Sequence, residues 1–108
     1  MELDVEKALQ KGIAAHKEGK LHEAELLYQA ILKSQPTNLH ANHNLGMLYY
    51  SFRRLDEAVA SFKKTIVLNP NFVEAYCDLG LGLKELGRLE ESEVSLRKAI
   101  ELKPDFAI

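Results

Sequence analysis

The sequence predicts an all-α protein, an α-solenoid of six helices that pair as three antiparallel hairpins. The first observation behind this prediction is spacing, because Pro36, Pro70 and Pro104 are evenly spaced along the chain. The second is periodicity, because apolar residues between the prolines recur at steps of three and four, as on one face of a helix. The sequence therefore predicts a single domain, 1–108, with repeats at 5–38, 39–72 and 73–106.

Each repeat is predicted to hold two helices joined by a very short link. In the last repeat these helices cover 73–86 and 89–102. Gly87 between them can adopt the left-handed backbone conformation that ends many helices. Pro104 stops the second helix, since proline has no amide donor and restricts the residue before it. A link this short requires the two helices to fold back on each other.

Glycines occupy one phase inside the first helix of every repeat, at Gly12, Gly46 and Gly80. A glycine in a helix interior costs roughly 1 kcal/mol relative to alanine. We therefore expect close approach of the partner helix at these three positions, which leaves no room for a Cβ atom. No segment shows the sustained alternation of apolar and polar residues that is typical of strands.

Composition favours an ordinary protein-binding domain over several other classes. The net charge is −2 and basic residues are dispersed, so no nucleic-acid surface is expected. The apolar runs are too short to span a membrane, and residues 1–7 do not form a signal peptide. With Cys77 as the single cysteine, no internal disulfide is possible. We expect a cytoplasmic location.

The residues of the third repeat resemble those of a known family. It contains Leu79-Gly80, then Gly87-Arg88-Leu89, and ends on Lys103-Pro104-Asp105. This resembles the tetratricopeptide repeat, whose 34-residue pattern combines Leu-Gly, aromatic residues, alanines and a closing proline. The second repeat matches the same pattern at Leu45-Gly46, Tyr49, Ala58, Phe62 and Pro70.

Two departures from the family pattern stand in the second repeat. Asn42 replaces an aromatic residue near the start of its first helix. Arg53 occupies the turn position that Gly19 and Gly87 occupy in the other repeats. A left-handed backbone at a residue with a side chain costs roughly 1 kcal/mol or more, so we expect strain there.

The resemblance implies a right-handed superhelix in which the first helices line a concave groove. It also implies a scaffold that binds an extended peptide or protein segment in this groove, without catalysis. The resemblance assigns ten groove residues: Gln10, Ile13, His40, His43, Asn44, Met47, Tyr50, Cys77, Asp78 and Leu81.

One use of such grooves in the family is a carboxylate clamp for the C-terminus of heat-shock chaperones. By the resemblance, the clamp positions hold Leu9, Ile13, Asn44, Glu74 and Asp78. Asn44 alone fits, and the two acidic residues would repel a carboxylate ligand. The sequence therefore argues against this clamp.

A second use is the asparagine ladder of O-linked N-acetylglucosamine transferase, which these repeats resemble in style. Its equivalents here are Gln10, Asn44 and Asp78. Amides can both donate to and accept from a peptide backbone, whereas a carboxylate can only accept. The ladder is therefore partial, and solvated groove residues without a ligand are an equal alternative.

No pattern in the sequence indicates catalysis or a cofactor. His40 and His43 share one helical face, but a metal site needs further ligands, for which Cys77 and Asp78 are the candidates. Cys77 lacks an evident base, and phosphate-binding and dinucleotide-binding glycine motifs are absent from the sequence. We expect no metal, no cofactor and no enzymatic activity.

The helix predicted at 89–102 has no later helix to cover it. Its apolar residues are therefore candidates for self-association: Leu89, Val94, Leu96 and Ile100. Two explanations remain open. The chain is the non-catalytic recruiting arm of a larger enzyme such as a glycosyltransferase, or it forms a homo-oligomer through this uncapped helix.

Overall fold

The structure is a computed structural model and describes residues 3–105. It contains six helices, and the described residues form no strand, which confirms the predicted all-α class. The helices are α1 (Val5–Lys17), α2 (Leu21–Ser34), α3 (Leu39–Ser51), α4 (Leu55–Leu68), α5 (Val73–Glu85) and α6 (Leu89–Leu102).

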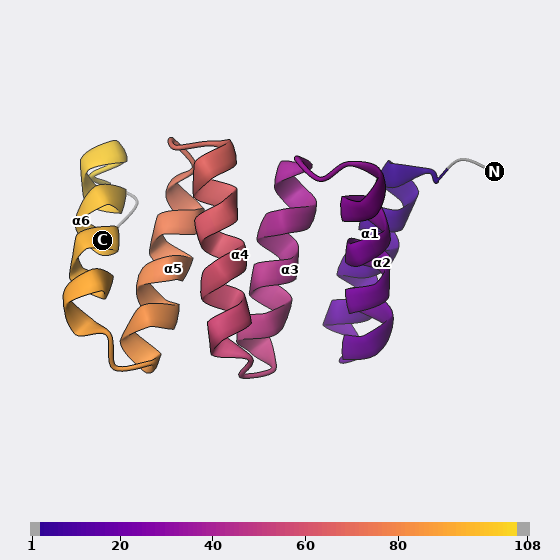
Figure 1. The fold of residues 1–108 in the computed structure, drawn as a ribbon, viewed down its shortest axis with the longest axis horizontal. Coiled ribbons are helices and arrows are strands. Elements are labelled where there is room, and N and C mark those ends of the chain that lie inside the picture. The colour runs from indigo at the N-terminus through magenta and orange to yellow at the C-terminus, as the bar shows by residue number, and fades with distance from the viewer. Residues whose placement is uncertain (1–2, 106–108) are drawn as a thin grey trace.

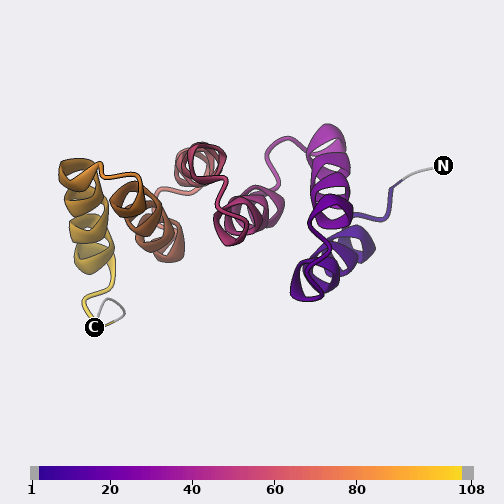
Figure 2. The same cartoon turned by 90° about the horizontal axis from the view of Figure 1, so that it is seen from below.

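The helices stand side by side in an elongated row of 45 × 25 × 21 Å (Figure 1). Each odd-numbered helix pairs with the next to form a hairpin, and α2 packs on α3 as α4 packs on α5. The first helices of successive hairpins also touch, α1 with α3 and α3 with α5. Figure 2 shows α1, α3 and α5 along one side of the row, with α2 and α4 along the other.

The glycine prediction is confirmed in all three hairpins. A Cβ atom at each of these positions would lie within 2.6 Å of a side-chain carbon of the second helix. Such a distance is far inside the 3.5–4.0 Å of optimal carbon contacts. The opposed pairs are Gly12 with Tyr28, Gly46 with Phe62, and Gly80 with Leu96.

The turns within the hairpins share one left-handed residue each. Gly19 and Gly87 have φ angles of 76° and 80°, and Arg53 has a φ angle of 65°. The expected strain at Arg53 is therefore present in the structure. The Nη1 atom of Arg53 donates to Oε2 of Glu85 at 2.8 Å, so its side chain joins the second hairpin to the third.

Asn42 makes the same backbone hydrogen bond as the aromatic residue that stands at its position in the third repeat. Its Nδ2 atom donates to the carbonyl oxygen of Pro36 at 3.2 Å. In the third repeat, the hydroxyl of Tyr76 donates to the carbonyl oxygen of Pro70 at 2.8 Å. Both bonds tie the first helix of a repeat to the proline before it, so the departure at Asn42 preserves the junction between repeats.

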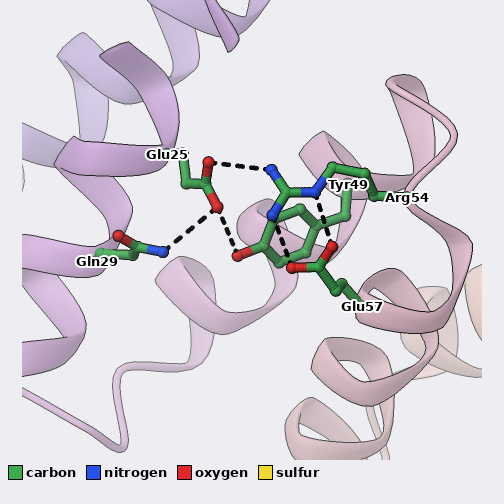
Figure 3. Close-up of polar contacts among 5 residues, drawn as sticks. All are labelled: Glu25, Gln29, Tyr49, Arg54 and Glu57. Atoms are coloured by element: carbon green, nitrogen blue, oxygen red, sulfur yellow. Dashed lines mark hydrogen bonds and ion pairs between the residues drawn. The ribbon is translucent and has the colours of Figure 1, made fainter. Parts of the chain in front are cut away.

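A polar network joins the first two repeats (Figure 3). The carboxylate of Glu25 accepts hydrogen bonds from the Tyr49 hydroxyl at 2.9 Å, from Arg54 at 3.1 Å and from Gln29 at 3.3 Å. Arg54 also pairs with Glu57 through two bonds of 2.7 Å, and its guanidinium lies 4.6 Å from the centre of the Tyr49 ring. The network therefore sets how α3 and α4 sit against α2.

The next interface uses apolar residues at the equivalent positions. Val59 stands one repeat length after Glu25, and Leu83 stands one repeat length after Tyr49. Both are buried members of the hydrophobic core. Equivalent positions therefore form a charged contact between the first and second repeats and an apolar contact between the second and third.

We predict that Gly80→Leu lowers the free energy of unfolding by about 1–3 kcal/mol, because the new side chain collides with Leu96. The double variant Gly80→Leu with Leu96→Ala should recover much of this loss, since it restores the total volume. Urea unfolding followed by circular dichroism measures both effects. A single variant as stable as the parent would contradict the packing argument.

Candidate functional site: the groove along the first helices

The first helices carry all ten groove residues predicted from the sequence. Gln10 and Ile13 lie on α1, while Cys77, Asp78 and Leu81 lie on α5. The other five lie on α3, namely His40, His43, Asn44, Met47 and Tyr50. Their exposure differs widely, from buried His43 to exposed Met47 and Leu81.

Two pockets lie in succession along this surface. The amino-terminal pocket, between α1 and α3, has a volume of about 390 Å³ and is lined by Ile13, His16, Lys17, Tyr28, Asn44 and Met47. The carboxy-terminal pocket, between α3 and α5, has a volume of about 220 Å³ and is lined by Met47, Tyr50, Ser51, Phe62, Asp78 and Leu81.

The two pockets are the same site one repeat apart. Every residue that lines the carboxy-terminal pocket stands one repeat length after a residue that lines the amino-terminal pocket. Met47 belongs to both, as the last member of one set and the first of the other. Its flexible thioether side chain, with Ile13 and Leu81 on either side, supplies apolar surface to the pair.

Tyr28 in the amino-terminal pocket carries a hydroxyl with no hydrogen-bond partner among residues 3–105. The residue is fully buried, and burial raises its pKa to about 12. The hydroxyl therefore keeps its proton at neutral pH and remains a donor. An unsatisfied buried polar group is uncommon in folded proteins and calls for a physical reason.

The sequence did not predict Tyr28 as a site residue. In the structure its ring lies against Gly12 of α1, within the hydrophobic core. The equivalent positions hold Phe62 and Leu96, which have no polar atom in the side chain. A hydroxyl at this position in the first repeat alone was the one feature of the sequence that could have drawn attention to Tyr28. Only the structure shows that nothing in the described chain satisfies it.

A hydrogen-bonded pair bridges α1 and α3 at the edge of the amino-terminal pocket. The Nε2 atom of His16 lies 2.9 Å from Oγ of Ser51, whose hydroxyl donates its single hydrogen to the Met47 carbonyl. Nε2 of His16 must therefore be the donor to Ser51. Burial lowers the pKa of His16, so the imidazole is neutral at neutral pH.

The carboxy-terminal pocket contains a carboxylate held by a buried imidazole. Nε2 of His43 lies 2.8 Å from Oδ2 of Asp78, and the His43 ring packs against Phe62 and Phe72. The second carboxylate oxygen of Asp78 has no hydrogen bond from the part of the chain that the structure describes. It is free to accept from a ligand.

Tyr50 and Glu85 meet at the rim of the carboxy-terminal pocket. Burial raises the pKa of Tyr50, and a hydrogen bond to Glu85 raises it further. The pKa of Glu85 is lowered by Arg53 first and by Tyr50 second. Tyr50 and Glu85 stand one repeat length after His16 and Ser51. A polar contact therefore joins α1 to α3 and α3 to α5 at equivalent positions.

Cys77 is a poor nucleophile in this setting. Burial raises the pKa of its thiol, and the negative charges of Asp78 and Glu74 raise it further. The thiolate, which is the reactive form, is therefore disfavoured at neutral pH. Within residues 3–105, no three side chains of His, Cys, Asp or Glu gather in a group able to hold a metal ion.

The residues proposed for self-association divide into three kinds. Leu89 and Ile100 are 63% and 48% exposed, whereas their equivalents Leu55 and Ile66 are partly buried. Val94 is exposed, but so are the residues at its phase in α2 and α4. Leu96 faces inward against Gly80. Leu89 and Ile100 are thus the two that are more exposed than their equivalents in the second repeat.

The tetratricopeptide repeat model matches residues 39–72 and 73–106, which together make up more than half of the chain. This protein therefore belongs to the tetratricopeptide repeat family, a class of helical repeat modules for protein–protein interaction. The first hairpin lies outside the match but has the same glycine contact. None of the helices in residues 3–105 has the length and apolar character needed to cross a membrane.

Solved structures of the same architecture are similar to nearly the whole chain. MamA has 26% identity and a TM-score of 0.89, with 95% of this chain and 60% of MamA covered. The first TPR of Spaghetti (RPAP3), bound to the HSP90 peptide SRMEEVD, has 27% identity and a TM-score of 0.87, with 96% and 85% covered. Its second TPR, bound to the same peptide, has 22% identity and a TM-score of 0.87, with 92% of each chain covered.

No curated protein gives a significant match to the chain.

We predict that Tyr28→Phe leaves stability at pH 7 unchanged or raises it by up to about 1 kcal/mol, because no hydrogen bond is lost. Tyr49→Phe is the matched control. Its hydroxyl donates to Glu25, so this variant should lose about 1–3 kcal/mol in urea unfolding.

The pH dependence gives a second measure of the same difference. Because the pKa of Tyr28 is raised from 10.0 to about 12, its contribution is fully present below pH 10 and is lost as the pH rises through about 12. Tyr28→Phe should therefore lose less stability than the parent between pH 10 and 12. Identical losses would show that the hydroxyl is not shielded.

Proposed function

We propose that this chain binds an extended peptide segment along the groove formed by α1, α3 and α5. The observation that carries the proposal is the pair of register-equivalent pockets that share Met47. A repeated pocket suits a ligand that itself repeats, and an extended peptide presents side chains at a regular interval. Concave, mostly apolar sites with a few polar groups are typical of ligand binding.

The related structures support a peptide ligand in general terms. Two of them are TPR domains bound to the HSP90 peptide SRMEEVD. The α5 part of the present groove is acidic, because it carries exposed Glu74 and the Asp78 carboxylate. An acidic C-terminal peptide would be repelled there, so we propose a ligand other than this class.

The asparagine ladder is reduced in this groove. Asp78 is held by His43, and Gln10 lies outside both pockets. Asn44 lines the amino-terminal pocket, and its amide has no hydrogen bond within residues 3–105. We propose that Asn44 is the rung that contacts the peptide backbone. The same groove would recruit substrate if the chain serves as the arm of a larger enzyme.

The test is a selection of random 12-residue peptides displayed on phage, followed by affinity measurement of the selected peptides. We expect Met47→Glu to weaken binding by at least about tenfold, because it places a charge in both pockets. Val67→Glu is the control, since Val67 is an exposed apolar residue on α4, outside both pockets. Equal binding by both variants would contradict groove binding.

We also propose that α6 mediates weak self-association through Leu89 and Ile100. Covering two exposed apolar side chains is favourable by the hydrophobic effect. The opposite end of the array is less suitable as a partner, because exposed Lys11 stands where Leu45 and Leu79 are buried. A second copy therefore meets α6 with its own α6, in a closed twofold arrangement.

Light scattering over a range of concentrations tests this second proposal. We expect the parent to dimerise at high concentration and the double variant Leu89→Lys with Ile100→Lys to stay monomeric. Val94→Lys is the control, because its position is exposed in every repeat, and it should behave as the parent. A parent that is strictly monomeric at millimolar concentration would refute self-association.

A further inference from the structure

We propose that the two groove pockets select opposite charges, with an acidic side chain of the bound segment in the amino-terminal pocket and a lysine or arginine in the carboxy-terminal pocket. This inference rests on the proposed peptide-binding function and deepens it. It assigns a ligand class, namely an extended segment in which an acidic and a basic residue lie a few positions apart.

The two equivalent pockets differ in the hydrogen-bond donors that line them. Three positions change from a hydrogen-bond donor to a group that donates less or not at all. Lys17, Asn44 and Tyr28 of the amino-terminal pocket are replaced by Ser51, Asp78 and Phe62, respectively. All three changes act in the same direction, because each lowers the affinity of the carboxy-terminal pocket for an anion.

The amino-terminal pocket is lined by three donors that lack a partner among the described residues. The Tyr28 hydroxyl is buried and unpartnered, and the described residues give Lys17 no ion pair and the Asn44 amide no hydrogen bond. The neighbouring His16 already donates through Nε2 to Ser51. A carboxylate accepts several hydrogen bonds and would satisfy the hydroxyl, the amide and the ammonium group together.

In the carboxy-terminal pocket the free group is an acceptor. One oxygen of Asp78 is occupied by His43, and the other has no hydrogen bond from the described residues. Glu85 is paired with Arg53 and does not line this pocket, whereas Asp78 does. The pKa of Cys77 is raised first by burial and then by the negative charges of Asp78 and Glu74, which lie on the same helix.

The apolar lining of the carboxy-terminal pocket suits the aliphatic stem of a basic side chain. Met47, Phe62 and Leu81 line it beside Asp78. Lysine and arginine bury their methylene groups against such surfaces while the charged head meets a carboxylate. A small acidic side chain would leave this apolar surface uncovered and would also be repelled.

The spacing of the two side chains follows from helix packing. Neighbouring packed helices lie about 8–10 Å apart, and an extended chain advances about 3.3 Å per residue. Since α1, α3 and α5 touch only marginally, these distances are a lower bound, and the pockets are at least about three residues apart along a bound segment. The direction of the segment is open, so both orders of the two charges belong in the test.

The experiment measures binding of synthetic, fluorescein-labelled 12-residue peptides to the 108-residue chain by fluorescence anisotropy. The peptides share one Ala, Ser and Leu background and differ at two positions three residues apart. These positions carry Glu and Lys in either order, two Glu, two Lys, or two Gln. We expect one mixed-charge order to bind at least about tenfold more tightly than the rest at low salt, and this advantage to shrink as salt is added.

Two variants assign the preference to its pockets. Lys17→Glu should transfer the preference to the peptide with two Lys, whereas Lys33→Glu on α2, outside both pockets, should change nothing. Tyr28→Phe should weaken the mixed-charge peptide while leaving the stability of the chain unchanged or higher. A Tyr28→Phe variant that binds as the parent would overturn the role of the hydroxyl.

The outcomes separate this inference from the proposed function. Equal affinity for all charge combinations would overturn charge selection and leave groove binding intact. Failure of all these peptides to bind would also overturn it, and the phage selection with Met47→Glu would then decide groove binding independently. A mixed-charge preference that survives Lys17→Glu would place the selection elsewhere on the surface and overturn the assignment to these pockets.

Discussion

The structure depends on one steric constraint, the contact between a helix with a glycine and a large side chain of its partner helix. Gly46 admits the edge of the Phe62 ring at a distance that no Cβ atom allows, and the other hairpins repeat this contact. The contact brings the two helices of a hairpin together and recurs once in every repeat. Because each hairpin buries its apolar faces mainly against its neighbours, an elongated array follows, with two equivalent pockets along its first helices.

The repeats share this geometry but differ in chemistry. At one register the chain uses Glu25 and Tyr49 in a charged junction, and Val59 and Leu83 in an apolar one. A polar junction holds only while every group in it is paired, whereas an apolar one depends on volume. Asn42 shows the same tolerance, since an amide replaces an aromatic hydroxyl and keeps the bond to the proline carbonyl. The family pattern therefore constrains shape more than residue type.

Most of the site could be placed on the fold from sequence, but its internal organisation could not. The family resemblance pointed to Asn44, Met47 and Asp78, and the structure has these residues on the first helices. The resemblance could not show that Met47 belongs to two pockets, because a shared wall depends on the distance between helices of different repeats. It also gave no indication that the Tyr28 hydroxyl lacks a partner. Sequence also could not show that Leu96, a candidate for self-association, packs against Gly80.

By itself the sequence determined the class of fold, the repeat length, the close helix contact at the glycines and the left-handed turn at Arg53. These properties are local, or recur at a fixed spacing, so one chain displays them without knowledge of its packing. Only the tertiary structure decided which polar groups are paired. The Asp78 carboxylate is held by His43 from the preceding repeat, and the Tyr28 hydroxyl finds no partner within residues 3–105. Pairing between repeats depends on side-chain reach across an interface, which residue spacing alone does not specify.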